Sequence, residues 1–474
     1  MDVFELRDKL IDDYSSFING FMHIKDDNIK KLVVEELKNG ILWPNPLIQI
    51  NPFFTAGDSI DKLIADGILH PDCRKIFRLK TDVNDSGKPI ELFKHQSEAI
   101  KQASHNNNYV LTTGTGSGKS LAYIIPIVNY ILQSGSGNGI KAIIIYPMNA
   151  LANSQEKELE KFLKDGYSET NRPVTFKRYT GQESDAQKKE ICANPPDIIL
   201  TNYVMLELIL TRPDEKPLVK ACNNLKFIVL DEFHTYRGRQ GADVAMLIRR
   251  TKEATHSKDI ICVGTSATMS SSPGLLSQKQ EVADISSCLF GSPVTPENII
   301  VESLKRITNE YDWDNPTKDD IDKLKQDVNA ILTLSQIEFE DLKNNHLASW
   351  IESTFGIGPD EDTGTLIRRT PISIFGKYGG GEILHKLTGI DITTCVKAIQ
   401  KMLLLGYQTH NPINDFPVFS FRLHQFISRG DTVYSSLDDK DNKYLTLQKQ
   451  LFVPHSKNKK VLLPLSFCRY CGQE

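Results

Sequence analysis

The middle of the chain alternates short apolar runs with longer segments of helical periodicity. Between about residues 90 and 295, runs rich in β-branched and aromatic residues are separated by stretches long enough for a helix. We predict strands in these runs, at 109–113, 141–147, 174–180, 197–202, 227–232 and 260–268. Strands that alternate with helices favour a parallel sheet covered by helices on both faces, so we expect an α/β lobe at 86–298.

The segment before this lobe has a largely helical pattern. The run IKKLVVEELK has helical spacing and is followed by a stop at Gly40. The next stretch, ILWPNPLIQINPFF at 41–54, is rich in proline and is interpreted as a loop. A short helix is expected near 59–67. Residues 1–85 are therefore predicted to form a helical N-terminal segment.

The part of the chain after the lobe predicts accessory elements. Residues 299–365 are charged and polar, and their pattern predicts a helical insertion. Residues 366–410 show a helix, a turn, a longer helix and a glycine, as in a small winged-helix module, although a plain helical insertion fits equally well. Residues 411–474 predict a β-rich accessory segment.

Composition places the chain among ordinary globular proteins and leaves its ligands open. With 474 residues we expect about two to four domains. A formal charge of −4 does not by itself indicate nucleic-acid binding, although a local basic groove can lie on a mildly acidic protein. No run approaches the roughly 20 apolar residues of a membrane span. We expect no membrane association, a cytoplasmic location and reduced cysteines.

The stretch TTGTGSGKS, from Thr112 to Ser120, carries the first chemical motif. A predicted strand enters it and an apolar helix leaves it, and its core is a P-loop with Thr113 in the place of the first glycine. Glycines let backbone N–H groups turn inward to phosphate oxygens, and the helix N-terminus adds partial positive charge. Lys119 should reach the β and γ phosphates, and the hydroxyl of Ser120 should bind Mg²⁺. The expected nucleotide-binding residues in the loop are Thr115, Gly116, Ser117, Gly118, Lys119 and Ser120.

A second motif ends the predicted strand FIVL with two acids and a histidine. Buried carboxylates are costly unless they are paired or bound to a metal, and ligands bind at the carboxyl ends of strands in open α/β sheets. A nucleotide with Mg²⁺ would bring the cation that these acids need. We expect Asp231 to hold Mg²⁺, and Glu232 to orient or deprotonate the attacking water. His234 is expected to link the γ-phosphate state to a neighbouring domain. The predicted catalytic residues are Lys119, Asp231, Glu232 and His234.

Over about 90–295 these motifs resemble the first, RecA-like lobe of superfamily-2 helicases of the DEAD/DEAH-box type. The run LFKHQSEAI is similar to the Q motif of that family, which implies that Gln96 reads adenine and that the nucleotide is ATP. The acidic box is similar to motif II, with Phe233 where the family usually has Ala. The run SAT is similar to motif III, which implies that Ser266 and Thr268 couple hydrolysis to strand movement.

Three further segments resemble the family's contacts to the nucleic-acid backbone. They are YPMNALANSQ at 146–155, YTGQ at 179–182 and TNYVMLE at 201–207. Their hydroxyls, amides and helix N-termini suit phosphate contacts, which hold a strand without reading its sequence. The resemblance implies nucleic-acid contacts by Pro147, Asn149, Thr180, Gly181, Thr201 and Asn202.

The run DEFHTYRGRQGADVAMLIRR is similar to MrfA-like helicases and to the very large helicases of phage-defence systems such as Druantia and DISARM. Those proteins carry a four-cysteine zinc cluster, and Cys468 and Cys471 have the spacing of zinc ligands. Two ligands do not complete a zinc site. Two interpretations therefore remain: the cysteines bind Zn²⁺ in a longer protein, or they are two surface thiols. The resemblance favours DNA, with RNA as the alternative, and a role in repair or in phage defence.

The family's second RecA-like lobe brings an arginine-finger motif, Q-x-x-G-R-x-x-R, which the sequence does not contain. We therefore expect the N-terminal part of a longer helicase, namely the ATP-binding motor lobe of an ATP-dependent DNA helicase or translocase. The missing lobe would come from a further C-terminal part or from a separate chain. A DNA-stimulated ATPase without unwinding and an ATP- and DNA-binding switch subunit of a defence or repair complex are the alternatives.

Overall fold

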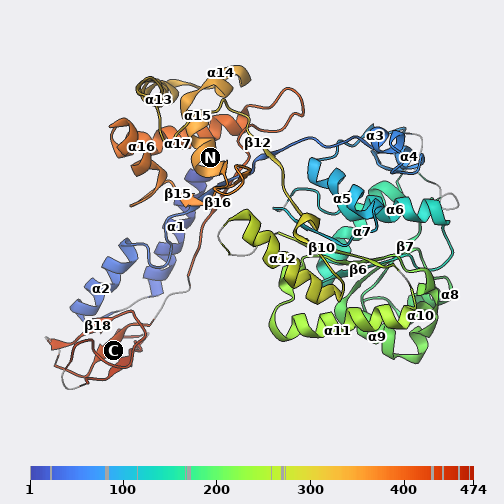
Figure 1. Ribbon diagram of the computed structural model, residues 1–474. Coiled ribbons are helices and arrows are strands. Elements are labelled where there is room, and N and C mark those ends of the chain that lie inside the picture. Colours follow the sequence, from blue (N-terminus) through green and yellow to red (C-terminus); the bar gives the residue numbers. More distant parts are fainter. Residues whose placement is uncertain are drawn as a thin grey trace. The chain divides into compact units, whose positions relative to one another are not determined.

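The computed structural model describes residues 2–21, 24–80, 85–114, 116–165, 167, 172–257, 259–267, 272, 274–428, 432–439, 442–456, 459–468 and 470–474. Backbone contacts divide the chain into two compact units (Figure 1). We call Phe53–Lys305 with Pro359–Ile367 the sheet unit. We call Met1–Pro52, Arg306–Gly358 and Arg368–Glu474 the accessory unit.

The sheet unit contains a seven-stranded sheet in which all neighbouring strands run parallel, in the order β11-β5-β10-β9-β6-β8-β7. The predicted α/β fold class is confirmed. The strands are β5 (Tyr109–Thr112), β6 (Ala142–Tyr146), β7 (Phe176–Tyr179), β8 (Ile198–Asn202), β9 (Phe227–Leu230), β10 (Ile261–Ser266) and β11 (Ile299–Val301).

Strand β11 lies beyond residue 298, where we predicted the lobe to end. Its three residues are too short to show a period, and its place at the sheet edge depends on pairing with β5, where Ile299 lies opposite Val110. The sheet therefore extends a few residues past the predicted boundary.

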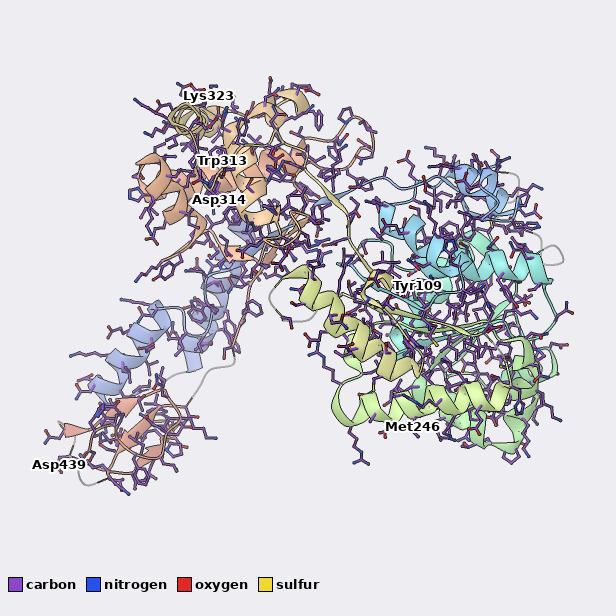
Figure 2. The ribbon with its side chains drawn as sticks, viewed as in Figure 1. Tyr109, Met246, Trp313, Asp314, Lys323 and Asp439 are labelled. Carbon is purple, nitrogen blue, oxygen red and sulfur yellow. The ribbon has the colours of Figure 1, made fainter. Side chains whose placement is uncertain are left out.

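Helices cover both faces of the sheet (Figure 1). Each face of the sheet forms a separate hydrophobic core with the helices that cover it. The side chains of β5 alternate between these cores, since Tyr109 and Leu111 belong to one core and Val110 to the other. Strands that are buried on both faces read as continuous apolar runs. Tyr109 is fully buried, whereas Met246 on the outer side of a covering helix is 59% exposed (Figure 2).

The first core contains α4 (Cys73–Ile76), α5 (Lys94–Ser104), α6 (Leu121–Ser134) and α7 (Asn149–Leu163). The second contains α8 (Asp185–Ala193), α9 (Tyr203–Thr211), α10 (Lys216–Ala221), α11 (Gly238–Thr255) and α12 (Leu275–Phe290). The helix α3 (Ile60–Ala65) also contributes to the first core, through Ile60 and Leu63. The remaining strands of this unit form two antiparallel pairs, β2 (Phe53–Phe54) with β12 (Leu304–Lys305) and β3 (Arg78–Leu79) with β4 (Lys88–Pro89).

The accessory unit packs helices against a small antiparallel sheet of order β15-β1-β16. Its central strand, β1 (Leu47–Ile50), lies where we predicted a loop, so that prediction is wrong. The prolines Pro46 and Pro52 flank the strand without interrupting it, and Ile48 and Ile50 alternate toward the core. The partner strands are β15 (Ile372–Ser373) and β16 (Phe421–His424).

The helices of the accessory unit are α1 (Val3–Phe21), α2 (Asp27–Lys38), α13 (Lys318–Ala330), α14 (Phe339–Asn344), α15 (His346–Ile351), α16 (Gly380–Thr388) and α17 (Ile392–Gln408). Gly389, at a φ of 74°, ends α16, and Asp391 caps α17, which produces the predicted helix, turn and longer helix. A further sheet of this unit consists of β17 (Tyr434–Ser436), β18 (Leu445–Thr446) and β19 (Leu462–Pro464). The strands β13 (Ile357–Pro359) and β14 (Leu366–Arg368) pair with each other and include the chain boundaries of the segment Pro359–Ile367. Across the described ranges, every helix is too short or too polar to cross a membrane.

Candidate functional site

Apart from Gln96 on α5 and the two predicted zinc ligands, the predicted site residues lie at or just after the carboxyl ends of the parallel strands, which share one edge of the sheet. The strand order separates them into two groups. The predicted nucleotide-binding and catalytic residues lie at the ends of three adjacent strands, β5, β10 and β9, and the predicted nucleic-acid residues lie at the ends of three others, β6, β8 and β7. One continuous edge therefore carries both groups side by side.

The P-loop turns on two glycines in the left-handed region, Gly116 at a φ of 83° and Gly118 at 69°. Between them Ser117 is fully buried, and its hydroxyl lies 2.7 Å from the hydroxyl of Thr113. Lys119 Nζ lies 3.4 Å from the carbonyl of Thr113 and 3.3 Å from Glu232 Oε1. The lysine thus joins the loop to the acidic box. Thr115 lies outside the described residues.

The segment that resembles the Q motif supports this loop from within the protein. Gln96 is buried, donates from its amide to the carbonyl of Gly118 at 2.8 Å, and accepts from the N–H of Phe93 at 2.8 Å. His95 Nε2 lies 2.9 Å from the carbonyl of Ser117. Both ends of the Gln96 amide therefore have partners in the chain. Its amide keeps one more N–H and one more lone pair for the predicted contact with adenine.

Asp231 lies buried at the end of β9 and is fastened by Thr265, a residue of β10. The hydroxyl of Thr265 donates to Asp231 Oδ1 and accepts from the N–H of Glu232 at 3.1 Å. Burial, together with the neighbouring charge of Glu232, raises the pKa of Asp231 to about 6. A bound cation would favour the ionised carboxylate and reverse that shift.

Glu232 adopts a left-handed conformation with a φ of 48°, which is uncommon for a residue with a side chain. Its Oε2 atom is buried without a hydrogen-bond partner and lies 3.4 Å from His234 Nδ1. The same His234 nitrogen lies 3.2 Å from Ser266 Oγ, so the histidine connects the acidic box to the run SAT. Burial lowers the pKa of His234, which keeps the ring neutral near pH 7. Thr268 lies outside the described residues.

The residues at this edge fit Mg²⁺. A hydroxyl and carboxylates are the hard oxygen ligands that this ion prefers, and they stand here as Ser120, Asp231 and Glu232. The unpartnered Oε2 of Glu232 is a buried acceptor that a hydrated cation or a water can satisfy. The hydroxyl of Ser120 donates its hydrogen to Gln155 Oε1 at 2.8 Å, which leaves both lone pairs of the oxygen for other partners.

The second group of predicted residues forms a linked cluster. The Asn202 side chain donates to Asn149 Oδ1 at 2.7 Å and to the carbonyl of Thr180 at 3.2 Å. Asn202 also caps α9 by accepting from the N–H of Met205. Pro147 lies partly exposed just after β6, ahead of Asn149. The structure therefore brings residues of β6, β7 and β8 together at one edge.

Three of the predicted nucleic-acid residues use polar groups for hydrogen bonds within the chain. Thr201 is fully buried and its hydroxyl donates to the carbonyl of Tyr179 at 2.7 Å. The N–H groups of Thr180 and Gly181 donate to Glu183 Oε2 at 2.8 and 2.9 Å. These residues hold the loops in shape, and the polar groups exposed at this edge belong to their neighbours.

Sequence reasoning missed several residues that shape the site. Thr265 lies in the predicted strand 260–268, immediately before the run SAT, and Gln155 ends the run YPMNALANSQ, so both lay in segments that the sequence had marked. Glu302 follows β11 and accepts from the N–H of Gly114 at 3.2 Å. No local pattern marks that carboxylate, because its position depends on the pairing of β11 with β5.

The predicted zinc ligands Cys468 and Cys471 are exposed free thiols. The N–H of Gly472 donates to the carbonyl of Cys468 at 2.8 Å, which closes a tight turn between them. A hydrogen bond from the backbone at Cys471 lowers the pKa of Cys468. Within the described ranges, no group of three or more metal-ligating side chains comes together.

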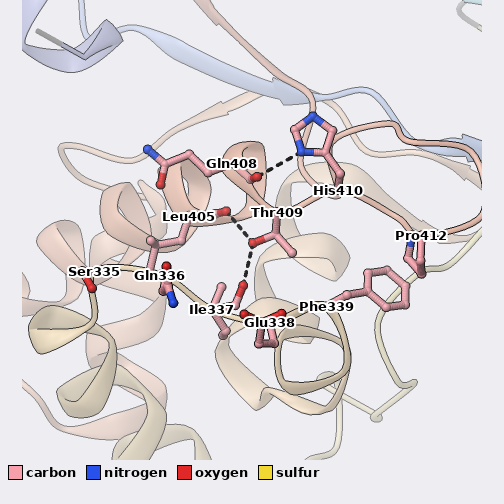
Figure 3. A pocket seen from close by; sticks show the side chains of 10 residues that line it. All are labelled: Ser335, Gln336, Ile337, Glu338, Phe339, Leu405, Gln408, Thr409, His410 and Pro412. Carbon is pink, nitrogen blue, oxygen red and sulfur yellow. Dashed lines mark hydrogen bonds between the residues drawn. The ribbon is translucent and has the colours of Figure 1, made fainter.

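A cavity of about 530 Å³ lies in the accessory unit, between the segment 335–339 and the end of α17 (Figure 3). The hydroxyl of Thr409, one of the lining residues, lies 2.9 Å from the carbonyls of both Ile337 and Leu405. His410 Nδ1 lies 3.0 Å from the carbonyl of Gln408. These groups bind one another, and they do not include the predicted catalytic residues.

Comparison with known proteins identifies relatives for part of the chain. Residues 93–275 match the family model described as DEAD/DEAH box helicase. The ATP-dependent helicase YprA of Bacillus subtilis is 33% identical over 181 residues, which make up 38% of this chain and 23% of that protein. The Druantia protein DruE of Escherichia coli is 23% identical over 382 residues, covering 55% of this chain and 20% of that protein. A crystal structure of the helicase MrfA bound to DNA is 25% identical, with a TM-score of 0.42, and the match covers 57% of this chain and 34% of that one. The chain thus spans less than a quarter of the length of the two curated relatives.

Proposed function

We propose, from the premise that residues 93–275 form a DEAD/DEAH box helicase domain, that this chain is the ATP-binding motor lobe of an ATP-dependent DNA helicase or translocase. The observation that carries the proposal is the position of Lys119 between the P-loop and Glu232, at 3.3 Å from the carboxylate. A lysine there neutralises phosphate oxygens while the acid faces the position of the attacking water.

The residues of the site have distinct roles in the proposed hydrolysis of ATP. Backbone N–H groups around Gly116 and Gly118 and the ammonium of Lys119 bind the phosphates. Glu232 orients the attacking water, and its free Oε2 accepts a proton from it. Thr265 holds both acidic residues in place. Ser120 and Asp231 would hold Mg²⁺, which would supply charge stabilisation for the phosphates when bound.

His234 and the exposed loops connect the nucleotide to movement. The ring of His234 contacts both Glu232 and Ser266, the last residue of β10. A change in charge beside Glu232 during hydrolysis would therefore alter the hydrogen bond between His234 and Ser266. We infer that Asn149 and Asn202 contact the phosphate backbone of the strand, without reading its sequence. DNA is the substrate that we propose, with RNA tested beside it.

A second RecA-like lobe completes the motor in this proposal. An arginine supplied opposite the P-loop contributes a factor of about 10³–10⁵ to hydrolysis in related NTPases. The chain by itself is therefore expected to bind Mg·ATP well and to hydrolyse it slowly.

The proposal is tested by measuring ATP binding and hydrolysis of the purified chain, with single-stranded DNA, with single-stranded RNA and without nucleic acid. Lys119→Ala should lose nucleotide binding. Glu232→Gln should keep binding and lose any turnover, because the amide cannot accept the proton of the water. Nucleotide binding that survives Lys119→Ala, or turnover that survives Glu232→Gln, would contradict the assigned roles. A strand-separation assay separates a helicase from a translocase that hydrolyses ATP without unwinding.

A further inference from the structure

Helix α7 contacts both halves of the functional edge. At its first residue, Asn149 accepts from Asn202 at 2.7 Å. Farther along, Asn153 accepts from Arg178 Nη1 at 2.6 Å. Gln155 Oε1 accepts from the hydroxyl of Ser120 at 2.8 Å. Positions six apart project from different faces of a helix, so α7 reaches the nucleic-acid loops from one face and the P-loop from another.

The contact between Gln155 and Ser120 controls how the serine can bind a cation. A serine hydroxyl has one hydrogen and two lone pairs. When the hydrogen points to Gln155, both lone pairs are free for Mg²⁺. When Gln155 is removed, the hydroxyl rotates freely and its hydrogen points toward the cation in part of the population. The glutamine therefore acts on the metal site without touching the metal or the nucleotide.

We propose that Gln155 is a positioning residue through which nucleic acid bound at the loops after β6, β7 and β8 strengthens the binding of Mg·ATP. A strand that contacts Asn149 and Asn202 fixes the N-terminus of α7, and α7 holds Gln155 against Ser120. The inference rests on the proposed function, because it needs both ligands. Since binding linkage is reciprocal, Mg·ATP strengthens nucleic-acid binding by the same factor.

The test measures equilibrium binding of a fluorescent ATP analogue to the purified chain over a series of Mg²⁺ concentrations, with and without single-stranded DNA. We expect the wild-type chain to bind the analogue at least about fivefold more tightly with DNA, the lower end of typical coupling. Gln155→Leu should bring this factor close to one. It should leave binding of the analogue without Mg²⁺, and binding of DNA without nucleotide, at their wild-type values.

Three further variants make the result specific. Gln155→Glu keeps an acceptor and should keep most of the coupling. Gln133→Leu, at an exposed glutamine on α6 outside the segments assigned to the site, should behave as the wild type. Gln155→Leu should add nothing in a Ser120→Ala background, because the hydroxyl that it positions is already gone. Melting temperatures identify any variant that fails to fold, and Gln155→Glu then carries the comparison with Gln133→Leu.

The outcomes separate this inference from the proposed function. Wild-type coupling in Gln155→Leu, or an additional loss of coupling in the Ser120→Ala background, would overturn the role of Gln155. Loss of Mg²⁺-free binding in Gln155→Leu would also overturn it, because a general structural role would then explain the effect. A wild-type chain that binds no analogue at any Mg²⁺ concentration would instead contradict the proposed function.

Discussion

At the scale of single residues, the site depends on backbone shapes that few side chains allow. Gly118 has a φ of 69°, and a Cβ atom at that position would lie 2.5 Å from Gln96 Nε2. The residue therefore combines a left-handed backbone with close packing against the amide that supports the P-loop. Gly67, at a φ of 72°, has the same backbone shape but open space around it.

These two glycines provide a matched prediction. Gly67→Ala should lower the free energy of unfolding by about 1 kcal/mol, the cost of placing an alanine in the left-handed region. Gly118→Ala should cost about 1 kcal/mol more, because it also breaks the hydrogen bond from Gln96, and it should weaken binding of an ATP analogue at least about tenfold. Urea unfolding and nucleotide titration check both values. Equal losses in the two variants would show that the Gln96 contact is unimportant.

At the scale of elements, the strands are fastened at the edge opposite the site by Asp197. This carboxylate is fully buried just before β8. It accepts from Ser136 Oγ at 2.7 Å and the N–H of Gly137 at 2.9 Å. It also accepts from the N–H and hydroxyl of Thr175 at 2.8 and 2.7 Å. The loops before β6 and β7 are thereby tied to β8.

Asp197→Ala should therefore destabilise the sheet unit without changing its chemistry. We expect a loss of about 3 kcal/mol in the free energy of unfolding, because several buried donors lose their acceptor. The KM for ATP should stay at the wild-type value, since the residue lies at the amino end of the strand. Asp243→Ala, an exposed carboxylate on α11, should change stability by less than about 0.5 kcal/mol. A raised KM in Asp197→Ala would indicate that the two edges are coupled.

At the scale of the whole molecule, the accessory unit has a core separate from the two cores of the sheet unit, and this core is assembled from distant parts of the chain. In the accessory unit, Ile48 of β1 is 1% exposed and packs in one core with Val328, Met402 and Phe419. A short N-terminal strand is thus the centre of a sheet whose other strands lie more than three hundred residues later.

Ile48→Ala should accordingly weaken the accessory unit and spare the ATP site. The expected loss is about 2–4 kcal/mol for a large buried side chain, seen as faster hydrogen exchange of the amides of α17. Ile41→Ala, at a side chain that is 40% exposed, is the matched control and should have a much smaller effect. Binding of the ATP analogue should be the same in both variants. Unchanged exchange in α17 would mean that β1 contributes little to this core.

The sequence by itself determined the parts of this protein that depend on contiguous residues. The P-loop, the acidic box and six of the seven strands of the parallel sheet each consist of one short run of residues, so a local pattern is enough to predict them. The resemblance to DEAD/DEAH-box helicases rested on the same runs and is confirmed for residues 93–275. The roles assigned to individual residues there stay predictions.

The tertiary structure decided what depends on strand order and on pairing at a distance. The order β5-β10-β9-β6-β8-β7 sets the nucleotide residues beside the predicted nucleic-acid residues, which the chain order does not show. The contacts of Thr265 with Asp231, and of Gln155 with Ser120, exist because separate segments meet at one edge. The strand β1 could not be predicted from its own residues, which lie between prolines. Four residues form a stable strand only when neighbouring strands supply hydrogen-bond partners, and here those strands come from distant parts of the chain.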